Sequence, residues 1–189
     1  NAVGTIPDVA RAAEMAHAAG VLVYVDAVHY SPHGLLDVQA LNCDFLACSA
    51  YKYFGPHTGI LYGKYDLLEE LTAYKVRPAP KHTPGKWETG TQSFESLAGV
   101  TAAVDYLAAI GDGDTRREQI VSAMGRIQAY EQSLSERFLR GATAVAGLRV
   151  YGLTDIERLA ERTPTFAVSL DSYTPAEVAA ALGEQGIFV

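Results

Sequence analysis

The sequence contains little cysteine and offers no arrangement of cysteines typical of a redox or metal site. Its 189 residues include only two cysteines, Cys43 and Cys48. They lie within or beside one apolar stretch and do not form a Cys-x-x-Cys pair, so we interpret them as small buried hydrophobic residues. Scarce cysteine is also typical of a reducing compartment and predicts a cytoplasmic protein.

The sequence also lacks long apolar runs and blocks of basic residues. No apolar run approaches the ~20 residues that a membrane-spanning helix needs, and the first residues lack the layout of a signal peptide. The formal net charge is −7, with acidic and basic residues mixed along the chain. No basic stripe marks a nucleic-acid surface. We therefore expect neither a membrane nor a nucleic-acid partner.

What is present is an alternation of apolar strands and amphipathic helices, which predicts the α/β class. Hydrophobic residues make up 49% of the chain, enough for a sizeable core.

Because the first residue is Asn1 rather than Met, and a strand is predicted to begin just before Val189, we expect an internal piece of a longer protein. The predicted helices cover 7–19, 37–41, 66–73, 94–109, 114–139 and 175–185, and the predicted strands cover 21–25, 44–48, 59–63, 148–151, 165–170 and 186–189.

Polar residues follow two of these predicted strands directly. Strand 21–25 leads into Asp26, and strand 44–48 leads into a polar loop that carries Lys52. Runs that are apolar on both faces favour central strands of a parallel sheet, where ligands sit off the carboxyl ends. The sequence therefore predicts that an acid and a lysine lie together at one edge of the sheet.

Each of these two residues has a functional and a structural interpretation. A partly desolvated Lys52 amine would lose its charge readily and could attack a carbonyl, whereas an ordinary lysine extends to the surface. Asp26 either caps the next turn or holds a ring nitrogen in its protonated form. Together they are the pair that a pyridoxal phosphate site needs. Hydroxyl groups that suit phosphate oxygens are available on Ser49, Tyr51 and Thr91.

The histidines suggest a metal site as a rival interpretation. His29 and His33 are four residues apart, but Pro32 and Gly34 argue against the helix that would place them on one face. We therefore predict no metal site. Two other histidines are interpreted as surface residues: His17 and His82.

Taken together, these residues resemble the class-V aminotransferase family of pyridoxal-phosphate enzymes, most closely its cysteine desulfurase-like branch. The order and spacing of the matching pieces are specific, and they span residues 1–107. The resemblance implies a three-layer fold of type I, with a mainly parallel seven-stranded sheet between helices, of which this chain is the later half. The matching pieces are NAVGT at 1–5, VDAVH at 25–29, DVQALNCDF at 37–45, SAYK at 49–52, GP at 55–56, GILYG at 59–63 and WETGT at 87–91.

The resemblance implies a role for each matched position. Lys52 would form the Schiff base with the cofactor, and Asp26 would pair with the pyridine nitrogen. His29 stands where many desulfurases carry Gln and would donate to the phenolic oxygen of the cofactor. Asn1 matches a residue near the same oxygen, and Ser49 would bind the phosphate.

Thr91 and Tyr51 carry the remaining implications of the resemblance. Thr91 matches a residue that reaches the phosphate of the neighbouring subunit, which implies a homodimer. Tyr51 stands where desulfurases have His and kynureninases have Tyr, so the pocket combines both patterns. Neither cysteine matches the catalytic cysteine of desulfurases. That cysteine and the arginine for the substrate carboxylate would lie beyond Val189, so the chain alone is expected to be inactive.

We therefore expect a cysteine desulfurase-like enzyme that uses pyridoxal 5′-phosphate and acts on an amino acid. The alternatives are an aminotransferase, an epimerase or a kynureninase-type lyase on the same fold, or a degenerate module that only dimerises. By domain, residues 1–112 would belong to the cofactor-binding large domain and 113–140 to a linking helix. Residues 141–189 would begin a small C-terminal α/β domain.

Overall fold

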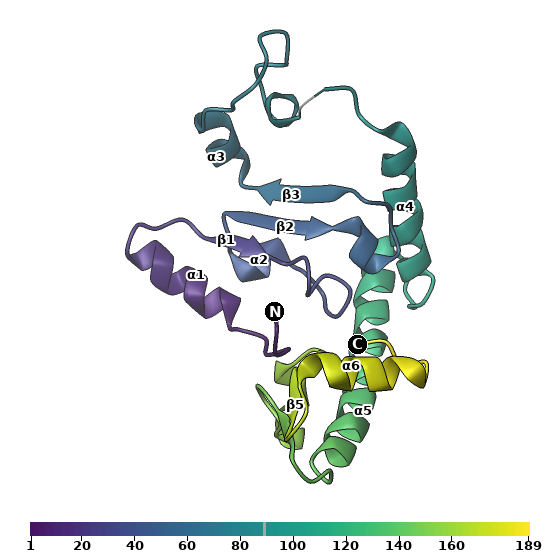
Figure 1. Ribbon diagram of the computed structural model, residues 1–189. Coiled ribbons are helices and arrows are strands. Elements are labelled where there is room, and N and C mark those ends of the chain that lie inside the picture. Colours follow the sequence, from purple (N-terminus) through teal and green to yellow (C-terminus); the bar gives the residue numbers. More distant parts are fainter. Residues whose placement is uncertain (89) are drawn as a thin grey trace. The chain divides into compact units, whose positions relative to one another are not determined.

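The computed structural model describes residues 1–88 and 90–189 and confirms the alternation of helices and strands. The chain divides into two compact units, residues 8–126 and residues 1–7 with 127–189. Thr89, within the WETGT piece, lies outside the described residues. The helices are α1 (Val9–Ala18), α2 (Val38–Leu41), α3 (Tyr65–Glu70), α4 (Phe94–Ala108), α5 (Arg116–Ala142) and α6 (Pro175–Glu184), and the strands are β1 (Tyr24–Asp26), β2 (Phe45–Ser49), β3 (Gly59–Gly63), β4 (Leu148–Val150) and β5 (Val168–Leu170) (Figure 1).

The larger unit is built on a three-stranded sheet in the order β1-β2-β3 (Figure 1). Strand β1 runs parallel to β2, with Asp26 opposite Ala47, and β3 runs antiparallel to β2, with Gly59 opposite Ser49. Because β1 and β2 are parallel, their carboxyl ends meet at the same edge of the sheet. The structure therefore brings Asp26 and the residues after Ser49 to one edge, as predicted.

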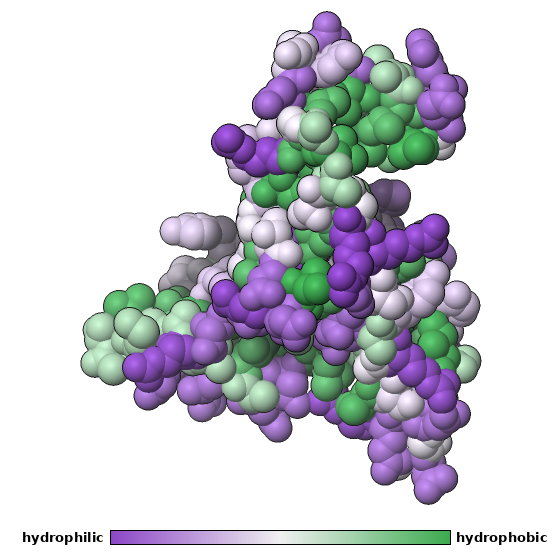
Figure 2. All heavy atoms as spheres, turned by 90° about the horizontal axis from the view of Figure 1, so that it is seen from below, coloured by the Kyte–Doolittle hydropathy of each residue, from purple (hydrophilic) through white to green (hydrophobic). Residues whose placement is uncertain are grey.

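Strand β1 is an outer strand of the sheet that the described residues form. It starts at Tyr24 rather than at Val21 and lies at the edge of the described sheet. The exposed fractions of Val21, Leu22 and Tyr24 are 55%, 53% and 61%. Figure 2 shows apolar side chains exposed among polar ones on one face of the molecule. The buried residues Ala27, Cys43 and Leu46 form the core beneath the sheet.

Local sequence signals explain where α1 begins and ends. The Asp8 side chain accepts a hydrogen bond from the Arg11 N–H at 2.9 Å and caps the helix, so α1 begins at Val9 rather than at the predicted residue 7. Gly20 has φ +71°, a backbone conformation that residues other than glycine rarely adopt. The N–H groups of Gly20 and Val21 donate to carbonyls of the last helical turn, and α1 ends at Ala18, one residue before the predicted end at 19.

Three other predicted boundaries are corrected. Helix α3 begins at Tyr65, one residue before the predicted start, and ends at Glu70, three residues before the predicted end at 73. Helix α5 continues to Ala142, three residues beyond the predicted end. The predicted strand 186–189 is not formed: Gly186 has φ +75° and the Ile187 N–H donates to the Leu182 carbonyl. These bonds close the end of α6 rather than pair a strand.

The smaller unit combines the antiparallel pair β4–β5 with the N-terminal segment 1–7. The Thr163 N–H donates to the Gly4 carbonyl at 2.8 Å. Arg162 is buried, and its guanidinium donates to the carbonyls of Thr163, Thr165 and Leu153. The bond from Thr163 to Gly4, with the bond from the Ile6 N–H to the Glu161 carbonyl, attaches the N-terminal segment to the chain around Arg162. None of the helices in residues 1–88 and 90–189 has the length and apolar character needed to cross a membrane.

We predict that Gly111→Ala destabilises the complete protein. A Cβ at Gly111 would overlap backbone atoms of Gln119 and Ala123 in α5, and such overpacking costs about 1–3 kcal/mol. Gly125→Ala is the matched control, because no described atom outside the helix's own backbone lies within 4 Å of the added methyl group. Urea unfolding should show a lower midpoint for Gly111→Ala and an equal or higher one for Gly125→Ala. Equal midpoints for Gly111→Ala and the native protein would contradict this packing.

Candidate active site

Lys52 lies on a tight turn that follows β2 without a break. Residues Ala50–Tyr53 form one short 3-10 helix, closed by bonds from the Ala50 N–H to the Thr58 carbonyl and from the Gly55 N–H to the Ala50 carbonyl, both 2.9 Å. A Cβ on Gly55 would approach the Ala50 Cβ to 2.8 Å, so the turn requires glycine there. The Gly-Pro sequence after Lys52 therefore fixes the backbone turn that places Lys52 at the end of β2.

Asp26 ends β1 at the same edge, as the parallel register requires. Its Oδ1 accepts a hydrogen bond from the Val28 N–H at 3.0 Å, so the carboxylate does cap the next turn. Asp26 and Lys52 are both exposed in the described chain. The partial burial on which the sequence interpretation of Lys52 depended is therefore not found.

His29 lies in the turn after β1, close to His33. Their ring centroids are 5.2 Å apart although the segment is a turn and not a helix. Burial lowers the pKa of His29, and the positive charges of His33 and Lys52 lower it further. At neutral pH His29 is therefore a neutral imidazole that can donate one N–H. In the part of the chain that the structure describes, no group of three or more His, Cys, Asp or Glu side chains could hold a metal ion.

Tyr51 borders Lys52 and is stacked on a histidine that the sequence interpretation missed. The rings of Tyr51 and His57 have centroids 5.1 Å apart and an interplanar angle of 23°. The Lys52 Nζ lies 5.4 Å from the centroid of the Tyr51 ring, within the range of a cation–π contact. No signal in the sequence indicated that His57 would lie beside Tyr51, because the contact depends on the path of the Gly-Pro turn.

Thr91 lies elsewhere in the same unit. It lines a hollow of about 420 Å³ formed by β3, α3 and the loop before α4. None of Asp26, His29, Ser49 or Lys52 lines this hollow. Within residues 8–126, the structure thus groups Asp26, His29, Ser49, Tyr51 and Lys52 at one edge of the sheet, and Thr91 lines a hollow whose wall includes Gly59, the strand partner of Ser49.

Asn1 belongs to the smaller unit, and its side chain is engaged within its own segment. The Nδ2 group donates to the Thr5 carbonyl at 2.8 Å, and Oδ1 accepts from the Gly4 N–H at 3.0 Å. These bonds fold the first residues into a turn. The role of Asn1 near a cofactor stays a prediction.

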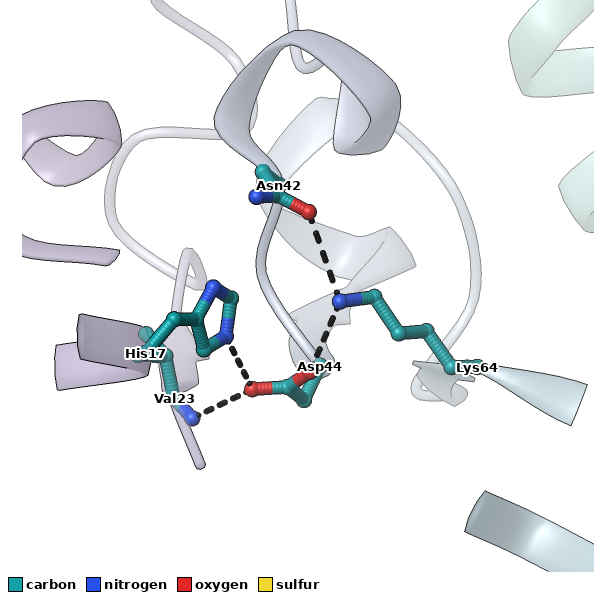
Figure 3. Close-up of polar contacts among 5 residues, drawn as sticks. All are labelled: His17, Val23, Asn42, Asp44 and Lys64. Carbon is teal, nitrogen blue, oxygen red and sulfur yellow. Dashed lines mark hydrogen bonds and ion pairs between the residues drawn. The ribbon is translucent and has the colours of Figure 1, made fainter. Parts of the chain in front are cut away.

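A second polar cluster, at the opposite edge of the sheet, was not predicted (Figure 3). The Asp44 side chain is 4% exposed and accepts hydrogen bonds from the Val23 N–H at 2.7 Å, from His17 at 2.8 Å and from Lys64 at 2.8 Å. Burial raises the pKa of Asp44, but the bonds from Lys64, His17 and Val23 outweigh it and bring the pKa to about 2. The interpretation of His17 as a surface residue is therefore wrong.

The Asp44 cluster has a structural role, because it joins the chain segments that flank three strands of the sheet. Asp44 precedes β2, Val23 precedes β1 and Lys64 follows β3, so all three lie at the edge away from Lys52.

The two cysteines behave as predicted: both are free, Cys43 is buried and Cys48 is half-buried. Burial raises the pKa of each thiol.

The sequence matches known proteins along its whole length. The family described as "Aminotransferase class-V" matches residues 1–189. The chain is 34% identical to the Streptomyces coelicolor protein named "Probable cysteine desulfurase" and 32% identical to a cysteine desulfurase of Pectobacterium atrosepticum, and each match covers 100% of this chain. The chain spans 44% and 45% of the lengths of these two relatives.

Two solved structures share the fold. The apo structure of a cysteine desulfurase from Thermococcus onnurineus NA1 matches with a TM-score of 0.85 at 23% identity and covers 100% of this chain and 46% of that one. The cysteine desulfurase CsdA from Escherichia coli matches with a TM-score of 0.70 at 30% identity, covering 96% of this chain and 44% of that one. The predicted α/β fold of type I is confirmed by these matches.

The whole-length family match and the shared fold lead to one conclusion. The chain belongs to the class-V aminotransferase family and is similar to its cysteine desulfurases.

Proposed function

We propose that the complete protein is an enzyme that uses pyridoxal 5′-phosphate to act on an amino acid, with Lys52 as the residue that holds the cofactor. The observation that carries this proposal is the position of Asp26 and Lys52 at the carboxyl ends of two adjacent parallel strands. In open α/β sheets, ligands bind outside these ends.

The chemistry of the side chains at this edge fits the cofactor. Lys52 offers a primary amine for an aldehyde, Asp26 offers a carboxylate for a protonated ring nitrogen, and Ser49 offers a hydroxyl for a phosphate oxygen. When bound, pyridoxal phosphate supplies an electron sink for the α-carbon of an amino acid. His29 fits as well, because the lowered pKa leaves a neutral imidazole with one N–H to donate.

Each residue would have a distinct task in the reaction. The Lys52 amine, once free, would remove a proton at the α-carbon of the substrate and return it. Asp26 would keep the ring nitrogen protonated, because an adjacent carboxylate favours the charged form. The His29 N–H would donate to the phenolic oxygen of the cofactor, and the Ser49 hydroxyl to its phosphate.

The substrate is the finer part of the proposal. The names of the relatives support L-cysteine, with desulfuration as the reaction. Tyr51 is stacked on His57 beside Lys52. Because desulfurases have His at the position of Tyr51, a transaminase, an epimerase or a kynureninase-type lyase remains the alternative. Assays of the complete protein with L-cysteine, L-kynurenine and other amino acids should separate them. With a thiol reductant present to convert the released sulfane sulfur to sulfide, equimolar alanine and sulfide from L-cysteine would establish desulfuration. Absence of both products, with turnover of another amino acid, would overturn it.

We also propose that the complete protein is a cytoplasmic homodimer in which Thr91 serves the site of the neighbouring subunit. The place of Thr91 in the piece WETGT at 87–91, within the family match, supports this assignment. A degenerate protein that only dimerises is the non-enzymatic alternative. It predicts no absorbance change when pyridoxal phosphate is added, whereas the proposed enzyme should bind one cofactor per chain.

We predict that Asp26→Asn weakens catalysis more than cofactor binding. Asparagine keeps the size and can still accept the Val28 hydrogen bond, but it lacks the charge that holds a ring proton. Loss of one such preorganised group costs about 10²–10³ in kcat. Steady-state kinetics and a cofactor titration of the same preparation measure both effects. Asp66→Asn, in the first turn of α3, is the control and should leave kcat unchanged. An unchanged kcat for Asp26→Asn would contradict the role of Asp26.

A further inference from the structure

The chain between α3 and α4 folds back against the end of α3 at a buried lysine, Lys86. The loop starts after Glu70 and runs to the first residue of α4, Phe94. Within it, Lys86 is 7% exposed, which is rare for a lysine. Its Nζ donates to the Glu69 carbonyl at 2.6 Å and to the Leu71 carbonyl at 3.1 Å. Lys86 thus binds the carbonyls that the end of α3 leaves without helical partners.

Neighbouring contacts tie the same part of the loop to the same helix. The Glu69 carboxylate accepts from the Thr83 N–H and pairs with the His82 ring at 3.3 Å. The hydrogen bond from the Thr83 N–H is the main reason why the pKa of Glu69 falls to about 2. The Trp87 indole N–H donates to the Leu68 carbonyl at 3.1 Å, and the Lys86 Nζ lies 5.5 Å from the Trp87 ring centroid. We call Glu69, Thr83, Lys86 and Trp87 the loop clasp.

The loop clasp ends just before the segment that carries Thr91. Trp87 and Thr91 both line the hollow of about 420 Å³, together with Leu68 of α3. Burial of an ammonium group is unfavourable unless it is hydrogen-bonded, and Lys86 meets that condition through the carbonyls of Glu69 and Leu71. The charge of Lys86 therefore favours the arrangement in which residues 82–87 lie against the end of α3.

We infer that Lys86 is a positioning residue for Thr91: it fixes the loop that presents the Thr91 hydroxyl to a cofactor phosphate. This inference rests on the proposed function, which gives Thr91 that role. Lys86 does not touch the cofactor itself. Its effect should therefore depend on the phosphate group and on Thr91, whereas a lysine that only stabilises the fold would affect every ligand alike.

The test compares two ligands, pyridoxal 5′-phosphate and pyridoxal, which lacks the phosphate. Spectroscopic titration of the apo form of the complete protein gives Kd for each. Lys86→Met should raise Kd for pyridoxal 5′-phosphate about tenfold, the size of one or two lost hydrogen bonds, and change Kd for pyridoxal little. Thr91→Ala should show the same selectivity, and the double variant should be no weaker than the weaker single one. Lys81→Met, an exposed lysine of the same loop, is the control and should match the native protein.

The outcomes separate the inference from the proposed function. If Thr91→Ala weakens binding of the phosphorylated ligand and Lys86→Met does not, the inference about Lys86 is wrong while the proposed function stands. If Thr91→Ala changes neither Kd, the role of Thr91 fails and the inference fails with it. Circular dichroism shows whether Lys86→Met folds. If it does not, Glu69→Ala, which breaks the other half of the loop clasp, should show the same selectivity, and equal Kd ratios for Glu69→Ala and the native protein would overturn the inference.

Discussion

Lys52→Ala should reduce turnover of the complete protein by about 10⁴-fold, the upper range for loss of a group that moves a proton in the reaction. Alanine leaves the turn intact, because the bonds that close it join backbone groups of Ala50, Gly55 and Thr58. The loss should therefore appear in kcat while the melting temperature stays within a few degrees of the native value. Steady-state kinetics and thermal unfolding of one preparation measure both.

Two variants make this result specific to the amine. Lys52→Arg keeps the positive charge, but a guanidinium group stays protonated and cannot take up a proton, so it should be as inactive as Lys52→Ala. Lys75→Ala removes an exposed lysine that bonds only to the nearby Ala79 carbonyl among its described contacts, and should leave kcat unchanged. Activity above a tenth of the native value in either Lys52 variant would contradict the assignment.

Asp44→Ala should cost about 3 kcal/mol of the free energy of unfolding, the lower range for removing one partner of a buried ion pair. The Asp44 carboxylate joins the N–H of Val23, the ring of His17 and the ammonium of Lys64 (Figure 3). Its removal would leave the Val23 N–H without its acceptor, the Lys64 ammonium without its counter-charge and the His17 ring without this hydrogen-bond partner. The value is placed at the lower end because the His17 and Lys64 side chains are 27% and 37% exposed. Urea unfolding of the complete protein measures it.

The same carboxylate predicts how stability depends on pH. The pKa of Asp44 lies at about 2 in the folded chain, below its ordinary value of 3.8. A lowered pKa stabilises the fold above the ordinary value, and this stabilisation is lost as pH falls from about 4 toward 2. Glu69, whose pKa also lies at about 2, contributes in the same window. The native protein should therefore lose more stability over this range than Asp44→Ala, and parallel pH profiles would contradict the role of Asp44.

The edge that carries Asp26 and Lys52 was predictable because it depends on local signals. Two short apolar runs, each followed by polar residues, are enough to predict strand ends, and the parallel register confirms that the ends of β1 and β2 meet. Gly20 and the Asp37 cap likewise act within a few residues of themselves, Asp37 through bonds to Gln39 and Ala40. These features need no knowledge of the rest of the fold.

The features that sequence missed all depend on contacts between distant residues. His17 and Asp44 are 27 positions apart, and Lys86 and Glu69 are 17 apart, so neither pair leaves a periodic signal. The exposure of Lys52 and of β1 depends on which strands cover the sheet, which no local pattern specifies. The last residues had the composition of a strand, but Gly186 directs the chain into a helix-ending turn.

Borohydride reduction of the complete protein with bound pyridoxal phosphate tests the central claim most directly. Reduction fixes the cofactor permanently to the amine that holds it, and peptide mapping by mass spectrometry locates that amine. The account predicts one pyridoxyl group per chain, on Lys52, and none in Lys52→Ala. A cofactor fixed to any other lysine, or bound cofactor that borohydride fixes to no lysine, would contradict it.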